Sequence, residues 1–375
     1  MLKKLFCFIS LICLCGCIPT QQLEHLGIIY AGGIDKTDDD KLLLTAVINQ
    51  FESQSKNKTK IVTGEAKTLK SAVENANLET NFQLTTGKVQ LDLFGLETAK
   101  RGIGSFIDAL ARDSTIPDTM YLAVSQTPAR DLITIQNKAI SVNTGQFLHD
   151  VIERNSSDHL FPIVTLVKFQ SSMFDVGRDP ILPLFELQGN IPKMTGIAIF
   201  KDDRYVGKLS MNDKYLFNLL EKRIKEERFE ASISAKALKK IIRSPMNQDE
   251  KNVNMAFEIV NGKGDIDVAN MDKLEFTINV QMNVTLMETT KELKLNTQKS
   301  MKIIEKEIQK ELTQKYKNIL AHLQELNTDA FGFGDVYRAH KTGSKLTKSE
   351  WRRLFPDIKT KFNIDVRLIG HGEIS

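Results

Sequence analysis

The reactive side chains with the most distinctive positions in this sequence are the cysteines, because all four lie within the first 17 of 375 residues. A cysteine thiolate can attack a carbon centre, bind zinc or form a disulfide. The four are Cys7, Cys13, Cys15 and Cys17. If residues 1–16 are removed as a leader, only Cys17 remains, so the mature chain would have no disulfide and no cysteine-based metal site.

Residues 1–16 have the three parts of a secretory signal peptide. Lys3 and Lys4 supply the positive start, residues 5–15 form an apolar run, and Gly16 is a small residue at a cleavage position. The apolar run is too short for a membrane-spanning helix, which needs roughly 20 apolar residues. We therefore expect this segment to direct export and to be removed.

The end of the leader, Leu14-Cys15-Gly16-Cys17, resembles the bacterial lipobox. The resemblance implies that Cys17 receives a diacylglycerol thioether and becomes the first residue of the mature chain, with residues 17–25 as a tether. Each buried methylene contributes about 0.8 kcal/mol, so two acyl chains anchor a protein stably where one does not. A plain secretory signal and an uncleaved helical anchor are the alternatives.

The charge of the chain argues against a nucleic-acid partner. There are 51 basic and 47 acidic side chains, and the loss of Lys3 and Lys4 with the leader would leave 49 against 47. No basic patch interleaved with aromatic residues occurs in the sequence.

Three short motifs match, in order, those of penicillin-recognising serine enzymes. They are Ser53-Gln54-Ser55-Lys56, Ser141-Val142-Asn143 and Lys341-Thr342-Gly343. The serine should open a buried helix and the third motif should lie on an inner strand. However, Phe51 is the only hydrophobic residue of 50–60, and 340–345 is polar. We predict that the protein is not an enzyme.

Metal and cofactor motifs are also absent from the sequence. His149 and His159 are ten residues apart, and no His-x-x-x-His pair exists for zinc. The acidic run 38–40 lacks the spaced ligands and the terminal glutamate of a calcium loop. There is no phosphate-binding P-loop. We expect no bound metal and no cofactor.

The first half of the chain alternates between strand and helix patterns. Expected strands are 26–30, ended by Gly32 and Gly33, then 42–51, 89–94 and 120–124, and expected helices are 68–77, 103–110 and 147–152. This alternation is typical of an α/β or α+β domain with a mixed sheet. Prolines and glycines are densest in 177–193, which predicts a boundary there. We therefore expect an N-terminal domain at 26–192 and a C-terminal domain at 193–375, which could include a small sub-domain at 193–245.

The second half contains the two clearest patterns. Residues 274–286 alternate apolar and polar side chains, which predicts a strand with one buried face, and 296–326 repeats apolar residues every three or four positions, which predicts a helix about 45 Å long. A hairpin is expected at 195–209. We further expect 253–260 to pair with 274–286 through a turn at 262–270, and the strand 364–369 to pair with 274–286. Gly332 is expected to end the helix.

These features, in this order, resemble the Ger(x)C spore-germination lipoproteins nearly end to end. The residues that carry the resemblance are Cys17, Gly33-Ile34-Asp35, Gly196 to Leu209 around Lys201 and Gly207, the long helix, Asp329 to Gly334 with Gly332 and Phe333, Trp351, and the terminal strand ending in Gly370. The resemblance implies a multidomain α+β fold with mixed β-sheets flanked by helices, and with the long amphipathic helix packed on the C-terminal sheet.

Members of that family are the C subunits of nutrient germinant receptors. The resemblance implies a partner role beside two integral membrane subunits, of A type and B type, at the outer face of the spore inner membrane. The alternative function is a lipid-anchored solute-binding protein. That function would require two similar lobes around a hinged cleft, which the long helix and the terminal strand do not suit.

Overall fold

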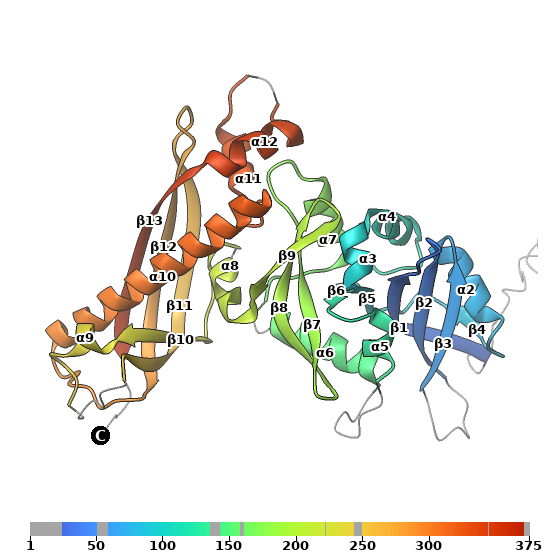
Figure 1. Ribbon diagram of the computed structural model, residues 1–375, viewed down its shortest axis with the longest axis horizontal. Helices are drawn as coiled ribbons and strands as arrows, with labels where there is room; N and C mark the ends of the chain where they lie inside the picture. The colour runs from blue at the N-terminus through green and yellow to red at the C-terminus, as the bar shows by residue number, and fades with distance from the viewer. Residues whose placement is uncertain are drawn as a thin grey trace, which may run out of the picture.

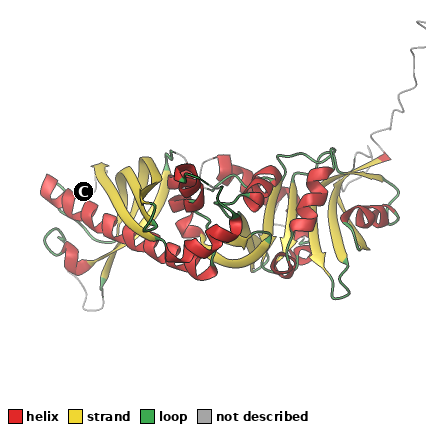
Figure 2. Cartoon of the chain, turned by 90° about the horizontal axis from the view of Figure 1, so that it is seen from above, coloured by secondary structure: helices red, strands yellow, loops and turns green. Residues whose placement is uncertain are grey.

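The computed structural model describes residues 25–50, 59–135, 143–157, 161–221, 223–243, 250–343 and 345–370. These residues form an elongated molecule with one β-sheet towards each end (Figures 1 and 2). The first sheet has nine strands and the second has four. The lipobox and Cys17 lie outside the described residues.

The first sheet is built outward from β1 (Leu26–Lys36), which lies between an antiparallel and a parallel neighbour. Its order is β3-β2-β1-β5-β6-β7-β8-β9, with β4 pairing beside β1. The other strands are β2 (Leu42–Asn49), β3 (Thr59–Ala66), β4 (Gln83–Thr85), β5 (Leu91–Gly95), β6 (Tyr121–Ser125), β7 (Ile181–Gln188), β8 (Ile191–Lys201) and β9 (Arg204–Ser210). Strand β1 pairs in parallel with β4 and β5, and the pairs β5–β6 and β6–β7 are also parallel. The other pairings are antiparallel, so the sheet is mixed.

Helices connect the parallel strands, as such crossovers require. They are α2 (Leu69–Asn77), α3 (Leu96–Arg101), α4 (Gly104–Arg112), α5 (Ala129–Ile133), α6 (Thr144–Ser157) and α7 (Leu166–Phe174). The expected end of the first strand at Gly32 and Gly33 is wrong. Both glycines lie inside β1, where side chains from neighbouring elements approach its backbone closely, and the strand continues to Lys36.

The hairpin expected at 195–209 is confirmed as β8 and β9. It belongs to the first sheet, because β8 also pairs with β7 along its other edge. The predicted domain boundary at 192 and 193 therefore lies within β8. The division into 26–192 and 193–375 stays a prediction, and by strand pairing the first unit extends to Ser210.

The second sheet has the order β10-β11-β12-β13. Its strands are β10 (Glu227–Ser234), β11 (Asn252–Asn270), β12 (Glu275–Thr289) and β13 (Lys359–Gly370). The expected pairings of β12 with β11 and with the terminal strand are confirmed, and the terminal pairing is parallel. The turn expected at 262–270 is wrong, because β11 continues through it and the chain reverses only at 271–274.

Helix α10 (Gln298–Leu326) confirms the long helix and packs across the second sheet (Figure 1). It begins at a capping box, in which the Thr297 and Ser300 side chains each accept from the other's backbone N–H. Its buried stripe includes Ile304, Leu312 and Tyr316. The helix ends at Asn327, whose left-handed backbone has a φ of 50°, and not at Gly332 as expected.

The remaining helices lie near the ends of the second sheet and between the two sheets. They are α8 (Lys214–Glu221), α9 (Ala235–Leu238), α11 (Phe333–His340) and α12 (Lys348–Leu354). The α+β fold with mixed sheets, flanking helices and a long helix on the C-terminal sheet is therefore confirmed. The two described sheets differ in size and strand order, so they do not form two similar lobes.

Candidate functional site: a buried polar junction between the sheets

The carboxylate of Asp329 is the centre of a buried polar cluster just beyond α10. One of its oxygens accepts hydrogen bonds from the backbone N–H groups of Gly332 (2.8 Å) and Phe333 (3.1 Å). The other accepts from Gly334 N (2.8 Å) and from the indole Nε1 of Trp351 (3.0 Å). Asp329 is 1% exposed, so this carboxylate has exchanged water for four protein donors.

Two opposing effects act on the ionisation of Asp329. Burial raises the pKa of Asp329 most, and the charge of the nearby Asp179 raises it further. The backbone N–H groups, that of Gly334 first, lower it in part, and the net pKa is about 7. Because all four contacts to the carboxyl group are donors, the local geometry stabilises the anion. The same geometry shapes the chain, since Gly332, with a φ of 85°, turns its N–H toward Asp329 at the start of α11.

Asp179 joins this cluster from the loop that precedes β7. Its carboxylate accepts from the backbone N–H of Asp329 (2.7 Å), and its own N–H donates to the Asp329 carbonyl (2.9 Å). Both terminal nitrogens of Arg352 donate to the two oxygens of Asp179. Burial lowers the pKa of Arg352, but the Asp179 carboxylate outweighs it and leaves the pKa raised. The pair is thus bidentate and charge-assisted.

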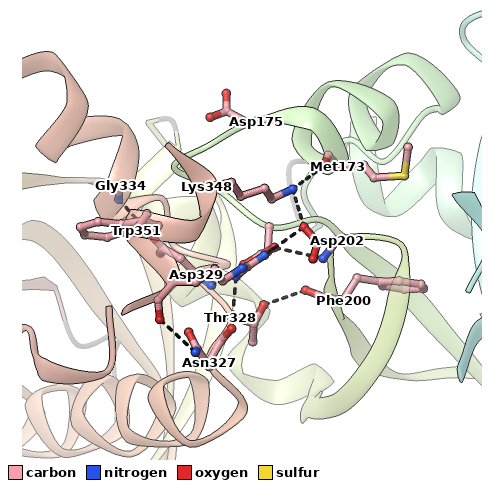
Figure 3. Close-up of polar contacts among 12 residues, drawn as sticks. Met173, Asp175, Phe200, Asp202, Asn327, Thr328, Asp329, Gly334, Lys348 and Trp351 are labelled. Atoms are coloured by element: carbon pink, nitrogen blue, oxygen red, sulfur yellow. Dashed lines mark hydrogen bonds and ion pairs between the residues drawn. The ribbon is translucent and has the colours of Figure 1, made fainter. Parts of the chain in front are cut away.

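The tight turn between β8 and β9 supplies a third carboxylate, Asp202 (Figure 3). Its oxygen lies 2.5 Å from Lys348 Nζ and 3.3 Å from Arg352. Burial raises the pKa of Asp202, but Lys348 and Arg352 together hold it below its usual range. Lys348 also donates to the Met173 carbonyl (2.6 Å). We call Asp179, Asp202, Asp329, Lys348, Trp351 and Arg352 the polar junction.

A close backbone contact accompanies the polar junction. A Cβ atom added to Gly334 would lie 2.5 Å from the Cα of Gly177 and 2.6 Å from Trp351 Nε1. A Cβ added to Gly177 would lie 2.2 Å from the backbone nitrogen of Asp335. Only glycine fits at both positions, so the loop before β7 and the first turn of α11 lie directly against each other.

An aromatic cluster lies beside the polar junction and fixes the position of α12. The ring of Phe276 from β12 meets Phe333 edge to face (5.3 Å between centroids) and Trp351 (6.4 Å). Trp351 also contacts Tyr337 and Phe355. Phe333 and Trp351 are buried. The indole is therefore held by packing while its N–H is held by Asp329.

Ion pairs extend the contact toward solvent. Arg178 pairs with Glu221 (2.8 Å) and Asp335 (3.2 Å), and Arg338 pairs with Asp175 (2.9 Å) and Asp335 (3.0 Å). The pKa of Asp335 is raised, first by burial and then by the Asp175 charge. These partly exposed pairs contribute less than the buried ones, but they join the same two regions of the chain.

The polar junction is suited to holding parts of the chain together and is poorly suited to catalysis. Its carboxylates are occupied by protein donors, and Asp179 and Asp329 are at most 3% exposed. The cavity lined by Arg178, Asp179 and Glu221 has a volume of about 30 Å³, which leaves room for a water but not a substrate. We infer that the junction fixes the position of the second sheet relative to the first.

The structure brings together some of the residues that the sequence singled out. Asp329, Gly332, Phe333, Gly334 and Trp351 form or adjoin the polar junction. Gly207 is nearby, since a Cβ there would lie 2.7 Å from Leu326 at the end of α10.

The other predicted residues lie elsewhere. Asp35 accepts from the backbone N–H groups of Ala129 (2.8 Å) and Arg130 (2.9 Å) at the start of α5. Gly33 lies in β1 beside Ala129, Gly196 lies in β8, and Gly370 ends β13 beside Thr285. Any functional role of these residues stays a prediction.

Sequence reasoning missed four of the six residues of the polar junction, namely Asp179, Asp202, Lys348 and Arg352. A signal was available for two of them: Asp179 lies in the glycine- and proline-rich stretch that was read as a boundary, and Arg352 directly follows the only tryptophan. Nothing local marks Asp202 or Lys348, because their partners are distant in the sequence.

Two other sites considered in the sequence can be placed in part. Within the described ranges, the group that could hold a metal ion is His149, Asp150 and Glu153 on α6. His149 Nδ1 already lies 3.2 Å from the Tyr30 hydroxyl and 3.0 Å from Asp150. His159 and the serine-enzyme residues 53–56, 141 and 142 lie outside the described residues. Lys341 of the third motif pairs with Glu350 (2.8 Å).

Comparison with known proteins identifies the class to which this fold and junction belong. Residues 19–187 match the family described as spore germination protein N-terminal domain, and residues 195–372 match that described as spore germination B3/GerAC like, C-terminal. The chain therefore belongs to the Ger(x)C family of spore germination proteins.

A relative and a solved structure agree with this assignment. Spore germination protein GerQC of Bacillus cereus is 21% identical over 373 residues, covering 99% of each chain. The crystal structure of the GerBC protein is similar in fold, with a TM-score of 0.51 and 16% identity over 90% of this chain and 96% of that one. Both similarities extend across the two sheets described above.

Proposed function

We propose that this protein is the membrane-anchored lipoprotein subunit of a spore nutrient germinant receptor, and that it acts by contact with other proteins and not by catalysis. The observation that carries the proposal is the match of both parts of the chain to spore germination families. In this role it would lie at the outer face of the spore inner membrane, beside integral membrane subunits of A type and B type.

The anchor in this proposal is the lipid on Cys17. Within the ranges that the structure describes, every helix is too short or too polar to span a bilayer. The lipobox sequence Leu14-Cys15-Gly16-Cys17 supports attachment through two acyl chains on the cysteine sulfur. The anchor would hold the folded part of the protein close to the bilayer, where it can contact the membrane subunits.

Helix α7 offers a surface that supports a role in protein contact. Val167 and Phe174 are 49% and 64% exposed and lie seven residues apart, on one side of the helix. Ile163, just before the helix, is 52% exposed. Single exposed hydrophobic residues are common, but a group of large ones is typical of contact surfaces.

The anchor can be tested with two neighbouring cysteines. Cys17→Ala removes the sulfur that would carry the lipid, whereas Cys15→Ala leaves the motif Leu-Ala-Gly-Cys intact and serves as the matched control. We expect Cys17→Ala to release the protein from the membrane and to abolish the nutrient response, and Cys15→Ala to behave as wild type. Membrane fractionation, mass spectrometry of the N-terminus and a germination assay measure these effects. If the Cys17→Ala protein stays in the membrane fraction and its spores still respond to nutrients, the proposed anchor is refuted.

The contact role can be tested on α7. Phe174→Glu places a charge on the exposed surface of α7. Leu78→Glu does the same at Leu78, which directly follows α2 and is 85% exposed. We expect Phe174→Glu to lower co-purification with the membrane subunits and Leu78→Glu to leave it unchanged. Equal recovery of the membrane subunits with both variants would exclude α7 as the contact surface.

A further inference from the structure

A cavity of about 660 Å³ lies in the first sheet's domain, away from the polar junction. It lies between the sheet on one side and helices α2 and α4 on the other. Its volume falls within the range of roughly 300–1,000 Å³ that is usual for small-molecule sites. The apolar lining includes Ile29, Leu44, Leu69, Val73, Val89 and Leu110.

A single carboxyl group, that of Asp92, lines this cavity from the sheet. Asp92 lies in β5 and pairs with Gly32 of β1 in the parallel register. A Cβ atom on Gly32 would lie 2.4 Å from Asp92 Oδ1, so the carboxyl group lies over the bare backbone of that glycine. The Gly32 position is therefore shaped to make room for the acid.

The Asp92 side chain has no protein partner among the residues that the structure describes. It is only 5% exposed, yet no hydrogen bond or ion pair reaches it from those residues. Burial alone raises its pKa to about 7. A buried, unpaired carboxyl group is costly, and other buried carboxyl groups of this chain, such as Asp179 and Asp329, are fully bonded. This contrast indicates that the partner of Asp92 is supplied from outside the fold.

We propose that the cavity binds a small organic cation, with an apolar body against its walls and a protonated amine on Asp92. An ammonium group offers three donors and a positive charge, which would satisfy the carboxylate in full. The charged side chains around the cavity are Lys70, Glu74, Arg112 and Asp113, two of each sign, so they do not select for an anion. This inference does not rest on the proposed receptor function.

The test compares ligands that differ only at the amine. Tryptamine carries the ammonium group, and 3-propylindole replaces it with a methyl group of similar size. Isothermal titration of both probes is carried out with the full chain in detergent. We expect tryptamine to bind the wild type at least tenfold more tightly than 3-propylindole does. Failure of tryptamine to bind the wild type at millimolar concentration would overturn the proposal.

Three variants assign any binding to this cavity. Asp92→Asn keeps the size of the side chain and should weaken tryptamine binding at least tenfold while leaving 3-propylindole binding unchanged. Val73→Trp fills the cavity from α2 and should abolish binding of both probes. Asp213→Asn alters another partly buried acid, outside the cavity, and is the matched control. Circular dichroism verifies that each variant is folded. Equal tryptamine affinity in wild type and Asp92→Asn would refute the role of the carboxylate.

Discussion

Arg352 binds both oxygens of the Asp179 carboxylate through its two terminal nitrogens, although the residues are 173 positions apart in the sequence. The pair connects α12 with the loop that enters β7. Because Asp179 also accepts from the backbone of Asp329, one ion pair holds together the end of α10, α12 and the first sheet. The predictions below test how strongly this arrangement and the buried acids govern stability.

Arg352→Ala should lower the free energy of unfolding by about 3–5 kcal/mol, because it leaves the buried Asp179 carboxylate without its cation. Arg352→Lys should lose less, since it keeps the charge but not the bidentate geometry. Urea unfolding followed by the fluorescence of Trp351, the only tryptophan, measures the loss.

The matched control for this prediction is the next residue. Arg353 is exposed, and Arg353→Ala should change the free energy of unfolding by no more than about 0.5 kcal/mol. If Arg352→Ala and Arg353→Ala lose equal stability, the ion pair does not hold the domains together.

Gly334→Ala should destabilise the protein by about 1–3 kcal/mol or more, as overpacking of a close contact does. The new methyl group would lie 2.5 Å from the Gly177 Cα. Gly334 lies in helix α11, where alanine is the better helix former, so any loss must come from the contact. Thermal unfolding is the measurement. Gly87→Ala, whose Cβ would have no atom nearer than 3.7 Å, should be close to neutral. Two variants with the same melting temperature would contradict the close packing.

The buried acid Asp92 should make stability depend on pH. Its pKa is about 7 in the folded protein, against roughly 3.9 when unfolded. Between these values the folded state binds the proton more tightly, so the free energy of unfolding should fall as pH rises from about 4 to about 7, by up to about 4 kcal/mol for this group.

Asp92→Asn removes this dependence and provides the comparison. The variant should gain stability relative to wild type as pH rises from 4 to 8, while the shift of Asp329 in the same direction remains in both proteins. Urea unfolding at several pH values measures the difference. Parallel pH curves for the two proteins would show that Asp92 is not titrating in the folded state as described.

The elements with long, regular patterns were predictable from sequence. The thirteen alternating residues of 274–286 and the apolar stripe of 296–326 correspond to β12 and α10, because each pattern repeats over enough residues to exclude another structure. The lone tryptophan and the run from Asp329 to Gly334 could be singled out by composition, but not the bonds between them.

What sequence reasoning missed depends on distant partners. β7 was hidden in a stretch that Pro183 and nearby glycines marked as irregular, yet β6 and β8 on its two sides provide the pairing that makes it a strand. Asp179 and Arg352 each look like ordinary charged residues until the fold brings them together. Asp92 likewise looks like an ordinary acidic residue in the sequence. Its role in lining the cavity follows from its position in β5 beside Gly32, which only the fold shows.

The continuity of the first sheet through β9 bears on how this protein can be dissected in the laboratory. A fragment cut where the two family matches meet, between 187 and 195, would separate β7 from β8 and leave an unprotected strand edge open to self-association. Helix α8 packs on β11, so the short stretch 211–213 lies between the last strand of the first sheet and the first helix that packs on the second sheet. A recombinant fragment that contains the whole first sheet would have to extend to Ser210, where β9 ends.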